Sequence, residues 1–334
     1  MNMKKDVFTK GLGAIAMFIL SAGVVSCDVH EWPEIEYEHL KLNLVFDTEF
    51  TNQYYDYTSA VTRSEDAPVE MHYIVRAYPV VNGTTNRNEY KEVTFSRTVE
   101  EDYNCETSIS LAPGDYHIIV WSEFTIDGKS YYNTDDFSKV TVDTSPYVGD
   151  TELRKTYRGK LDVTVRKSNN ETDRELEGTV EMSSPMARYV FVANDLQEFI
   201  DNERSKKGGP VSLDDYYVKV RYTQFMPSAY NLFSLKPNDS LTGISFTSTL
   251  ENYSSGKAAL GFDYVFVNGS ESKVFVQMMV YRKSDNEELA RTPQIAVPTL
   301  RGVNTIVEGP FLGFQSKDGI GVDPNFEGDI NIYF

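Results

Sequence analysis

The stretch Tyr216-Tyr217-Val218-Lys219-Val220-Arg221-Tyr222-Thr223 decides the fold class of this 334-residue chain. Tyr216, Val218, Val220 and Tyr222 alternate with polar residues such as Lys219, Arg221 and Thr223. This period of two predicts a β-strand with one face in the core. Leu161–Val165 shows the same alternation, and Ile330, Ile332 and Phe334 repeat it near the end of the chain. Each such segment can bury one face and leave the other in water, as antiparallel sheets do.

Turn residues separate the predicted strands. Asn268-Gly269 lies between residues 258–267 and 273–282, and Asp127-Gly128 follows residues 116–126. Both dipeptides favour two-residue hairpin turns, because both central positions of such a turn need a positive φ. The sequence predicts one short helix, over Leu196–Arg204, with Asn194-Asp195 as its capping residues.

A domain boundary is predicted near residues 145–150, where Pro146 and Gly149 interrupt the strand pattern. The chain is therefore predicted to be all-β, with two tandem antiparallel β-sandwich domains of the Greek-key type over residues 40–147 and 148–334. One large barrel is the alternative architecture.

The N-terminus carries an export signal. A lysine-bearing head precedes the apolar stretch Leu12–Val25, and Val24-Val25-Ser26-Cys27 resembles a bacterial lipobox. The apolar stretch of about 14 residues is too short to span a bilayer, which needs about 20. We therefore predict a signal peptide over residues 1–26, lipid on Cys27, and an acidic tether over residues 27–39. These features predict a lipid-anchored protein of the outer membrane that faces the cell surface, with a transmembrane helix or an ordinary cleaved signal as the alternatives.

Composition limits the partners of the chain. The net charge is −18, and it becomes −20 when residues 1–26, with three lysines and Asp6, are removed. Such an acidic body repels nucleic acid and anionic headgroups. If Cys27 carries lipid, only Cys105 remains, so no intramolecular disulfide can form. A sizeable apolar core must then stabilise the exported protein.

No motif for catalysis or for a cofactor is present. The four histidines form no HExxH pair, and CxxC, G-x-S-x-G and Gly-rich phosphate loops are missing from the sequence. Acidic pairs occur at Asp135-Asp136, Asp214-Asp215 and Glu287-Glu288, but adjacent strand residues point to opposite faces. We predict that the protein is not an enzyme and needs no metal or cofactor. A hydrolase built from distant carboxylates is the remaining catalytic alternative.

Aromatic residues offer a different alternative. Trp32, Trp121, Tyr54-Tyr55 and Tyr131-Tyr132 could stack on sugar rings, as in a surface glycan-binding lipoprotein of a polysaccharide-uptake system. However, Trp121 ends the apolar run Ile118-Ile119-Val120-Trp121, and the first prediction for it is a core residue.

Four stretches resemble the fimbrillin-like lipoproteins of the Bacteroidales, a family that includes fimbrial anchor subunits. Cys27-Asp28-Val29-His30-Glu31-Trp32-Pro33 follows the signal, and Leu111–Trp121 resembles a Gly-x-Tyr turn with a strand ending in Trp. Met182–Phe191 resembles the Pro-x-Ala-Arg opening of the second domain. Val297–Gly309 is close to an Arg-Asn-x-x-Thr-x-Ile-x-Gly pattern, although Gly302 stands in place of the Asn.

The resemblance implies two transthyretin-like sandwiches and a fimbrial anchor, accessory subunit or adhesin at the cell surface. Its partners would be other fimbrial subunits, contacted through added β-strands. Polymerising members are cut after an arginine, for which Arg63 is the early candidate, although it also fits an ordinary loop arginine. The C-terminal residues Ile330, Ile332 and Phe334 could donate a strand to a partner or close their own sheet, and closure is favoured slightly.

Overall fold

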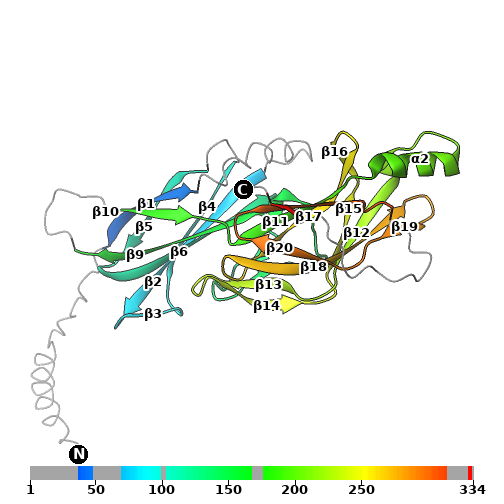
Figure 1. The fold of residues 1–334 in the computed structure, drawn as a ribbon. Coiled ribbons are helices and arrows are strands. Elements are labelled where there is room, and N and C mark those ends of the chain that lie inside the picture. Colours follow the sequence, from blue (N-terminus) through cyan, green and yellow to red (C-terminus); the bar gives the residue numbers. More distant parts are fainter. Residues whose placement is uncertain (1–36, 48–68, 99–102, 168–175, 314–329, 333–334) are drawn as a thin grey trace, which may run out of the picture. The chain divides into compact units, whose positions relative to one another are not determined.

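Strands dominate the computed structural model, which describes residues 37–47, 69–98, 103–167, 176–313 and 330–332 (Figure 1). The predicted all-β class is confirmed, and one α-helix occurs among the described residues. The alternating segments at residues 161–165 and 216–222 both form strands. The apolar members of the pattern are buried in residues 216–222, whereas in residues 161–165 only Val165 is buried and Leu161 and Val163 are half-buried.

Two sheets pack together in the first half of the chain. One has the order β10-β1-β5 and the other the order β3-β2-β6-β9, with β4 also paired to β2. Their bounds are β1 Glu38–Phe46, β2 Val69–Val81, β3 Thr84–Thr85, β4 Lys91–Thr98, β5 Cys105–Leu111, β6 Gly114–Ile126, β9 Thr156–Val165 and β10 Leu176–Met182.

Three further sheets follow the orders β16-β17-β11-β21-β22, β15-β12-β18-β19 and β14-β13-β8-β7, and β20 pairs with β18. The bounds are β7 Tyr132–Asn133, β8 Val140–Val142, β11 Met186–Ala193, β12 Tyr216–Tyr222, β13 Met226–Asn231, β14 Lys236–Leu241, β15 Ser245–Thr249, β16 Glu251–Ser254, β17 Lys257–Phe266, β18 Glu271–Arg282, β19 Glu288–Arg291, β20 Ile295–Leu300, β21 Asn304–Gly309 and β22 Ile330–Ile332. The helix α2 spans Leu196–Lys207, and short 3-10 turns occupy η1 Glu152–Arg154 and η2 Leu213–Asp215.

The strands β2 and β6 are buried on both faces. Val75 and Val120 belong to one apolar cluster, whereas Ile74 and Trp121 belong to the other. Such a strand reads as a continuous apolar run rather than an alternating one. Burial on both faces explains why Ile118-Ile119-Val120-Trp121 is fully apolar. The sheet that contains β2 and β6 therefore contributes side chains to both apolar clusters.

Strand pairing crosses the predicted domain boundary. β9 and β10 both follow residue 147, yet β9 pairs with β6 and β10 pairs with β1. The division at residues 147 and 148 stays a prediction, and residues 37–334 cluster together as one compact unit.

Most strand pairs are antiparallel, as predicted, and two are parallel: β1 with β10, and β11 with β21. One expectation about pairing was wrong. Asn268-Gly269 does not close a hairpin, because β17 and β18 lie in different sheets. Asp127-Gly128 does form a tight turn, with φ angles of 51° and 70° and reciprocal backbone bonds between Ile126 and Lys129.

The helix α2 begins where the sequence predicts, but it is capped differently. Asp195 holds the N-cap position without a side-chain cap bond. Its carboxylate instead accepts hydrogen bonds from the backbone N–H groups of Leu312 and Gly313. The predicted capping residue therefore fixes a distant segment beside the start of the helix.

Gly159 allows β9 to pack closely against β10. A Cβ atom there would lie 2.4 Å from Val180 Cγ1, 2.7 Å from Met182 Sδ and 2.9 Å from the Glu181 carbonyl oxygen. We expect Gly159→Ala to lower the free energy of unfolding by about 1–3 kcal/mol, because the neighbouring strand must move. Urea unfolding would measure this loss, and Gly209→Ala, which meets nothing within 4 Å, is the control. Equal stability of the two variants would contradict the close packing of β9 against β10.

Candidate functional site

The edge formed by β21 and β22 is the candidate site for contact with another chain. β22 is the last strand of its sheet, and it pairs antiparallel with β21 through Thr305 with Ile332, Ile306 with Asn331 and Val307 with Ile330. On its other side β21 pairs in parallel with β11. A terminal strand at a sheet edge can be exchanged, because its departure exposes the backbone groups of its neighbour.

Side chains hold β21 in place independently of β22. Arg188 on β11 donates to Asn304 Oδ1 at 2.8 Å, and Lys257 on β17 donates to Glu308 at 2.8 Å. Thr305 is fully buried and donates to the Pro298 carbonyl at 3.1 Å. β21 would therefore remain as an ordered template if β22 left.

The predicted site residues are only partly placed. Cys27 and Arg63 lie outside the described residues, as does Phe334. Ile330 and Ile332 lie in β22, which in this structure pairs with its own sheet. Lipidation of Cys27, cleavage at Arg63 and strand donation all stay predictions.

Two predicted aromatic platforms are buried. Trp121 is 0% exposed and donates its indole N–H to Glu123 at 3.0 Å, and Tyr132 is buried beside it. Burial raises the pKa of Glu123 to about 7, while the hydrogen bond from Trp121 opposes that shift. Trp32 and Tyr54-Tyr55 lie outside the described residues. Exposed large aromatic side chains occur instead at Tyr37, Tyr90, Phe225 and Tyr253.

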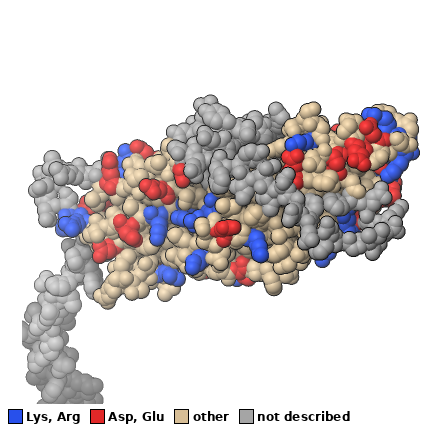
Figure 2. All heavy atoms as spheres, in the orientation of Figure 1, with Lys and Arg blue, Asp and Glu red and all other residues tan. Residues whose placement is uncertain are grey.

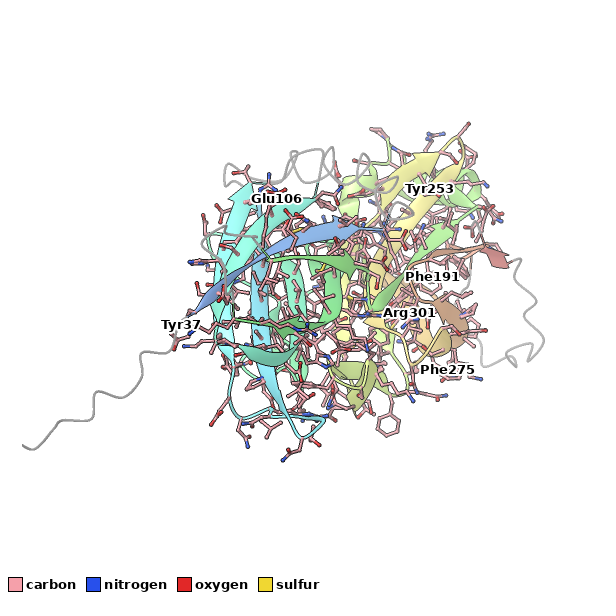
Figure 3. All side chains as sticks on the ribbon, turned by 90° about the vertical axis from the view of Figure 1, so that its left-hand side faces the viewer. Tyr37, Glu106, Phe191, Tyr253, Phe275 and Arg301 are labelled. Atoms are coloured by element: carbon pink, nitrogen blue, oxygen red, sulfur yellow. The ribbon has the colours of Figure 1, made fainter. Side chains whose placement is uncertain are left out.

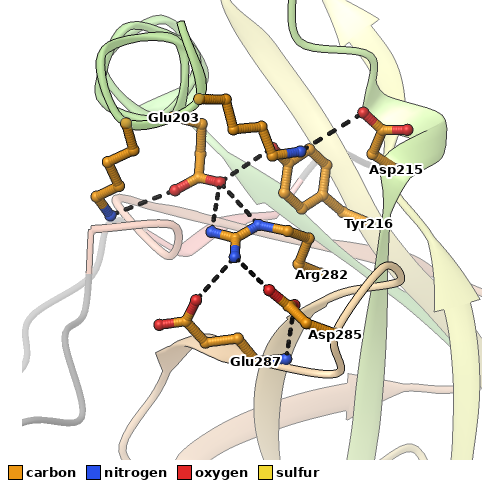
Figure 4. Close-up of polar contacts among 8 residues, drawn as sticks. Glu203, Asp215, Tyr216, Arg282, Asp285 and Glu287 are labelled. Atoms are coloured by element: carbon orange, nitrogen blue, oxygen red, sulfur yellow. Dashed lines mark hydrogen bonds and ion pairs between the residues drawn. The ribbon is translucent and has the colours of Figure 1, made fainter.

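Glu287, from one of the predicted acidic pairs, belongs to a group of ion pairs around Arg282 (Figure 4). The Arg282 guanidinium lies 2.9 Å from Glu203, 2.9 Å from Asp285 and 2.7 Å from Glu287. Glu288 pairs with Arg291, and Asp215 lies 3.7 Å from Lys207. Together with the hydrogen bond from the Tyr216 hydroxyl to Glu203, these contacts tie α2 to β12 and β18.

Glu203 is the buried centre of this network, which the sequence did not single out. Burial alone would raise the pKa of Glu203, but hydrogen bonds from Arg282, Lys206 and Tyr216 outweigh it and lower that pKa. Its folded-state pKa thus lies below the ordinary value of 4.5. The stability that the ionised Glu203 carboxylate contributes is fully present above pH 4.5. It is lost as the pH falls through the folded-state pKa of Glu203.

Glu203→Gln should therefore lower the free energy of unfolding at pH 7 by about 2 kcal/mol, since a charged hydrogen-bond acceptor is lost. The difference from the unsubstituted protein should shrink as the pH falls below about 4.5. Denaturant unfolding at pH 7 and pH 3.5 measures both values. A difference that stays constant over this range would contradict the assignment.

A second buried polar cluster surrounds Asp263 on β17. Its carboxylate accepts hydrogen bonds from Arg154 at 3.2 Å, from the Tyr147 and Tyr222 hydroxyls at 2.6 and 2.7 Å, and from the Tyr264 N–H at 2.8 Å. Asp263 and Arg154 are each 1% exposed. Burial raises the pKa of Asp263, while Arg154 and the two phenols oppose that shift. With its carboxylate held by four donors, Asp263 stabilises the core, although the Arg154 Nε–H of the same cluster has no hydrogen-bond partner among the described residues.

Two histidines and one cysteine remain to be placed. His72 bonds to Ser96, His117 lies 3.2 Å from Asp162, and Cys105 is a buried thiol on β5. Within the described ranges, no group of three or more His, Cys, Asp or Glu could hold a metal ion. The same part of the chain contains no helix long and apolar enough to cross a membrane. Figure 2 shows acidic and basic side chains interspersed over the described part of one face.

Comparison with known proteins gives one family match. A family model described as "Family of unknown function (DUF6562)" matches residues 34–333. No curated protein matches the chain.

Comparison with solved structures gives matches of low identity. The fimbrial anchor protein Mfa2 from Porphyromonas gingivalis is 12% identical with a TM-score of 0.41, covering 82% of this chain and 91% of that chain. A candidate adhesin from Bacteroides thetaiotaomicron is 15% identical with a TM-score of 0.42, covering 82% and 92%. A candidate polysaccharide-binding protein from the same species is 8% identical with a TM-score of 0.42, covering 82% and 93%. Similarity at this level transfers none of these roles to the chain.

Proposed function

Because the chain belongs to DUF6562, a family described as having unknown function, its role rests on its own residues. We propose that it is a non-enzymatic, lipid-anchored cell-surface protein that acts as a fimbrial anchor, accessory subunit or adhesin. It contacts other fimbrial subunits by exchange of β-strands. The observation that carries the proposal is the strand β22, which lies at the edge of its sheet and pairs with β21.

The N-terminal sequence supports the location. The lipobox-like Val24-Val25-Ser26-Cys27 would place lipid on the first residue of the mature protein. The acidic residues that follow keep the body away from anionic headgroups, so attachment depends on the lipid. The outer membrane and its outer surface are the proposed location.

The position of β22 at the edge of its sheet, beside β21, supports strand exchange as the mode of contact. Partner strands add to a sheet edge through main-chain hydrogen bonds, and β21 offers such an edge once β22 leaves. The alternation of Ile330, Ile332 and Phe334 also suits the pockets that an edge offers to alternate side chains.

A reversible crosslink tests strand exchange. Ile306 and Asn331 are register partners, so Ile306→Cys with Asn331→Cys should lock β22 in place when oxidised. We expect the oxidised variant to lose co-purification with fimbrial subunits and the reduced variant to regain it. Glu251→Cys with Ala259→Cys crosslinks β16 to β17 at the opposite edge and is the control. Unchanged subunit binding by the locked protein would contradict strand exchange.

Glycan binding is the second candidate, favoured by the exposed aromatic side chains of Tyr253 and Phe225, which are 47% and 68% exposed. Glycan arrays would separate the two functions. Tight sugar binding that Tyr253→Ala or Phe225→Ala abolishes would favour the glycan-binding lipoprotein.

A further inference from the structure

The strand β15 ends its sheet, and its outer edge has no partner strand among the described residues. The sheet has the order β15-β12-β18-β19, so β15 is hydrogen-bonded to β12 on one side only. After β15 the chain enters β16, which joins a different sheet and carries the exposed side chain of Tyr253 (Figure 3). The strand that follows β15 therefore leaves the outer edge of β15 uncovered.

The register with β12 determines which backbone groups of β15 face outward. Tyr222 donates its N–H to the Ile244 carbonyl at 2.9 Å, and the pairing continues without a bulge to the end of β15. Because hydrogen-bonded and non-hydrogen-bonded pairs alternate in an antiparallel ladder, the even-numbered residues of β15 bond to β12. The N–H and C=O groups of Ser245, Thr247 and Thr249 therefore point away from the sheet.

One of these outward groups already has a partner, at the end of β15. Burial raises the pKa of Asp150 to about 6, and hydrogen bonds from the N–H groups of Phe262 and Thr249 oppose that shift. No backbone hydrogen bond engages the outward groups of Ser245 or Thr247 in the part of the chain that the structure describes. Thr247 is also exposed to solvent. The open part of the edge is thus Ser245–Thr247.

The sequence of β15 does not protect this edge. Charged side chains, prolines and bulges usually prevent a sheet edge from pairing with another chain. The edge strand β14 has Lys236, Pro237, Asp239 and shifts in register, and β16 has Glu251 and one such shift. The sequence Ser245-Phe246-Thr247-Ser248-Thr249 has none of these features, and every other edge strand of four or more described residues has at least one. The edge of β15 is therefore open to strand addition.

Two basic side chains lie next to the open edge. Lys219 and Arg221 on β12 are exposed, and they are the register partners of Thr247 and Ser245, so all four side chains share one face of the sheet. Neither basic residue forms an ion pair within the described ranges, although acidic residues outnumber basic ones by 50 to 32. A strand added to β15 would lie about 10 Å from β12, which is two interstrand spacings. Long basic side chains can extend over the short side chains of Ser245 and Thr247 toward that strand.

We propose that β15 binds an extended acidic segment of another polypeptide, which adds to the sheet as a further strand. The main chain of the segment bonds to the outward groups of Ser245 and Thr247, and acidic side chains at alternate positions pair with Lys219 and Arg221. This contact goes beyond the proposed function, because it uses a different sheet edge from β22 and does not require β22 to leave.

A ten-residue peptide of alternating glutamate and valine, blocked at both ends, tests the charge complementarity. Calorimetry with the full-length protein at 50 mM salt should show one-to-one binding. A peptide of the same composition with its glutamates in one block should not bind, because only alternation places the acids on one face of a strand. Lys219→Gln with Arg221→Gln should weaken binding by about fivefold, as expected for two exposed ion pairs. Lys129→Gln with Lys160→Gln removes two exposed charges elsewhere and is the control.

Thr247→Pro tests the backbone contact. Proline has no N–H group, and it is tolerated at an edge where that group faces solvent. Peptide binding should fall at least about tenfold, because a main-chain hydrogen bond is lost and the ring obstructs the edge. Thr247→Val is the control, and the two variants should melt at similar temperatures. Should the proline variant unfold, peptides N-methylated at every glutamate or at every valine replace it. Only one of these two peptides should lose binding, because alternate N–H groups of a strand face opposite edges.

Four results would overturn the proposal: no binding of the alternating peptide, equal binding of the block peptide, unchanged binding by Thr247→Pro, or equal loss in the Lys129→Gln with Lys160→Gln control. A dimer of the protein alone that Thr247→Pro dissociates would also overturn it, since the edge would then belong to a second copy. The oxidised Ile306→Cys with Asn331→Cys variant should bind the peptide normally. Loss of binding in that variant would place the peptide at β21 instead, so this proposal and the exchange of β22 fail separately.

Discussion

Asp263→Ala should lower the free energy of unfolding by about 3–5 kcal/mol, which is the largest stability effect that we expect from a single substitution. The variant removes the carboxylate that lies 3.2 Å from Arg154 and leaves that guanidinium charged in the core. It also leaves the Tyr147 and Tyr222 hydroxyls without their acceptor. Removing one member of a buried pair destabilises more than the pair itself stabilises.

Denaturant unfolding measures this loss, and Asp263→Asn refines it. The amide keeps the shape and one acceptor oxygen but not the charge, so its loss should be smaller than that of Asp263→Ala. Asp162→Ala is the matched control, because Asp162 is an exposed carboxylate beside His117 and should change stability by at most about 0.5 kcal/mol. A loss of similar size for Asp263→Ala and Asp162→Ala would show that the cluster does not stabilise the core.

Cys27→Ala should release the protein from the membrane altogether. Each buried methylene of a lipid chain contributes about 0.8 kcal/mol to membrane binding, so loss of several chains removes the anchor. Cell fractionation followed by immunoblotting measures the distribution. Cys105→Ala is the control, because it removes the only other thiol and leaves the predicted lipid site intact. Retention of Cys27→Ala in the membrane fraction would contradict lipid anchoring.

Local strand structure could be predicted from the sequence, and the reason is geometric. Residues 216–222 alternate because a half-buried strand has a period of two, and β12 buries Tyr216, Val218, Val220 and Tyr222. Asp127-Gly128 also specifies its turn, because few residues accept two positive φ angles in succession.

Sheet partners could not be predicted in the same way. Asn268-Gly269 specifies a turn but not the sheet that the next strand joins. The parallel pairing of Leu40 with Leu176 joins residues more than a hundred positions apart, and no local pattern encodes it. Tertiary packing alone determines these contacts.

For the candidate sites too, local features could be predicted from the sequence, whereas tertiary contacts could not. Ile330 and Ile332 follow from alternation, whereas their partner β21 follows only from the fold. Asp263 carries a weak signal, because an acid within the apolar run Leu260–Phe266 needs buried donors.

The intact mass of the native protein from its own membrane, with surface protease accessibility, tests the central claim most directly. We predict a chain that begins at a lipidated Cys27 and is cleaved by protease added to whole cells. A chain that begins at Ser64 would instead indicate cleavage after Arg63 and a polymerising pilin. An unlipidated chain, or one protected from external protease, would contradict a lipid-anchored surface protein.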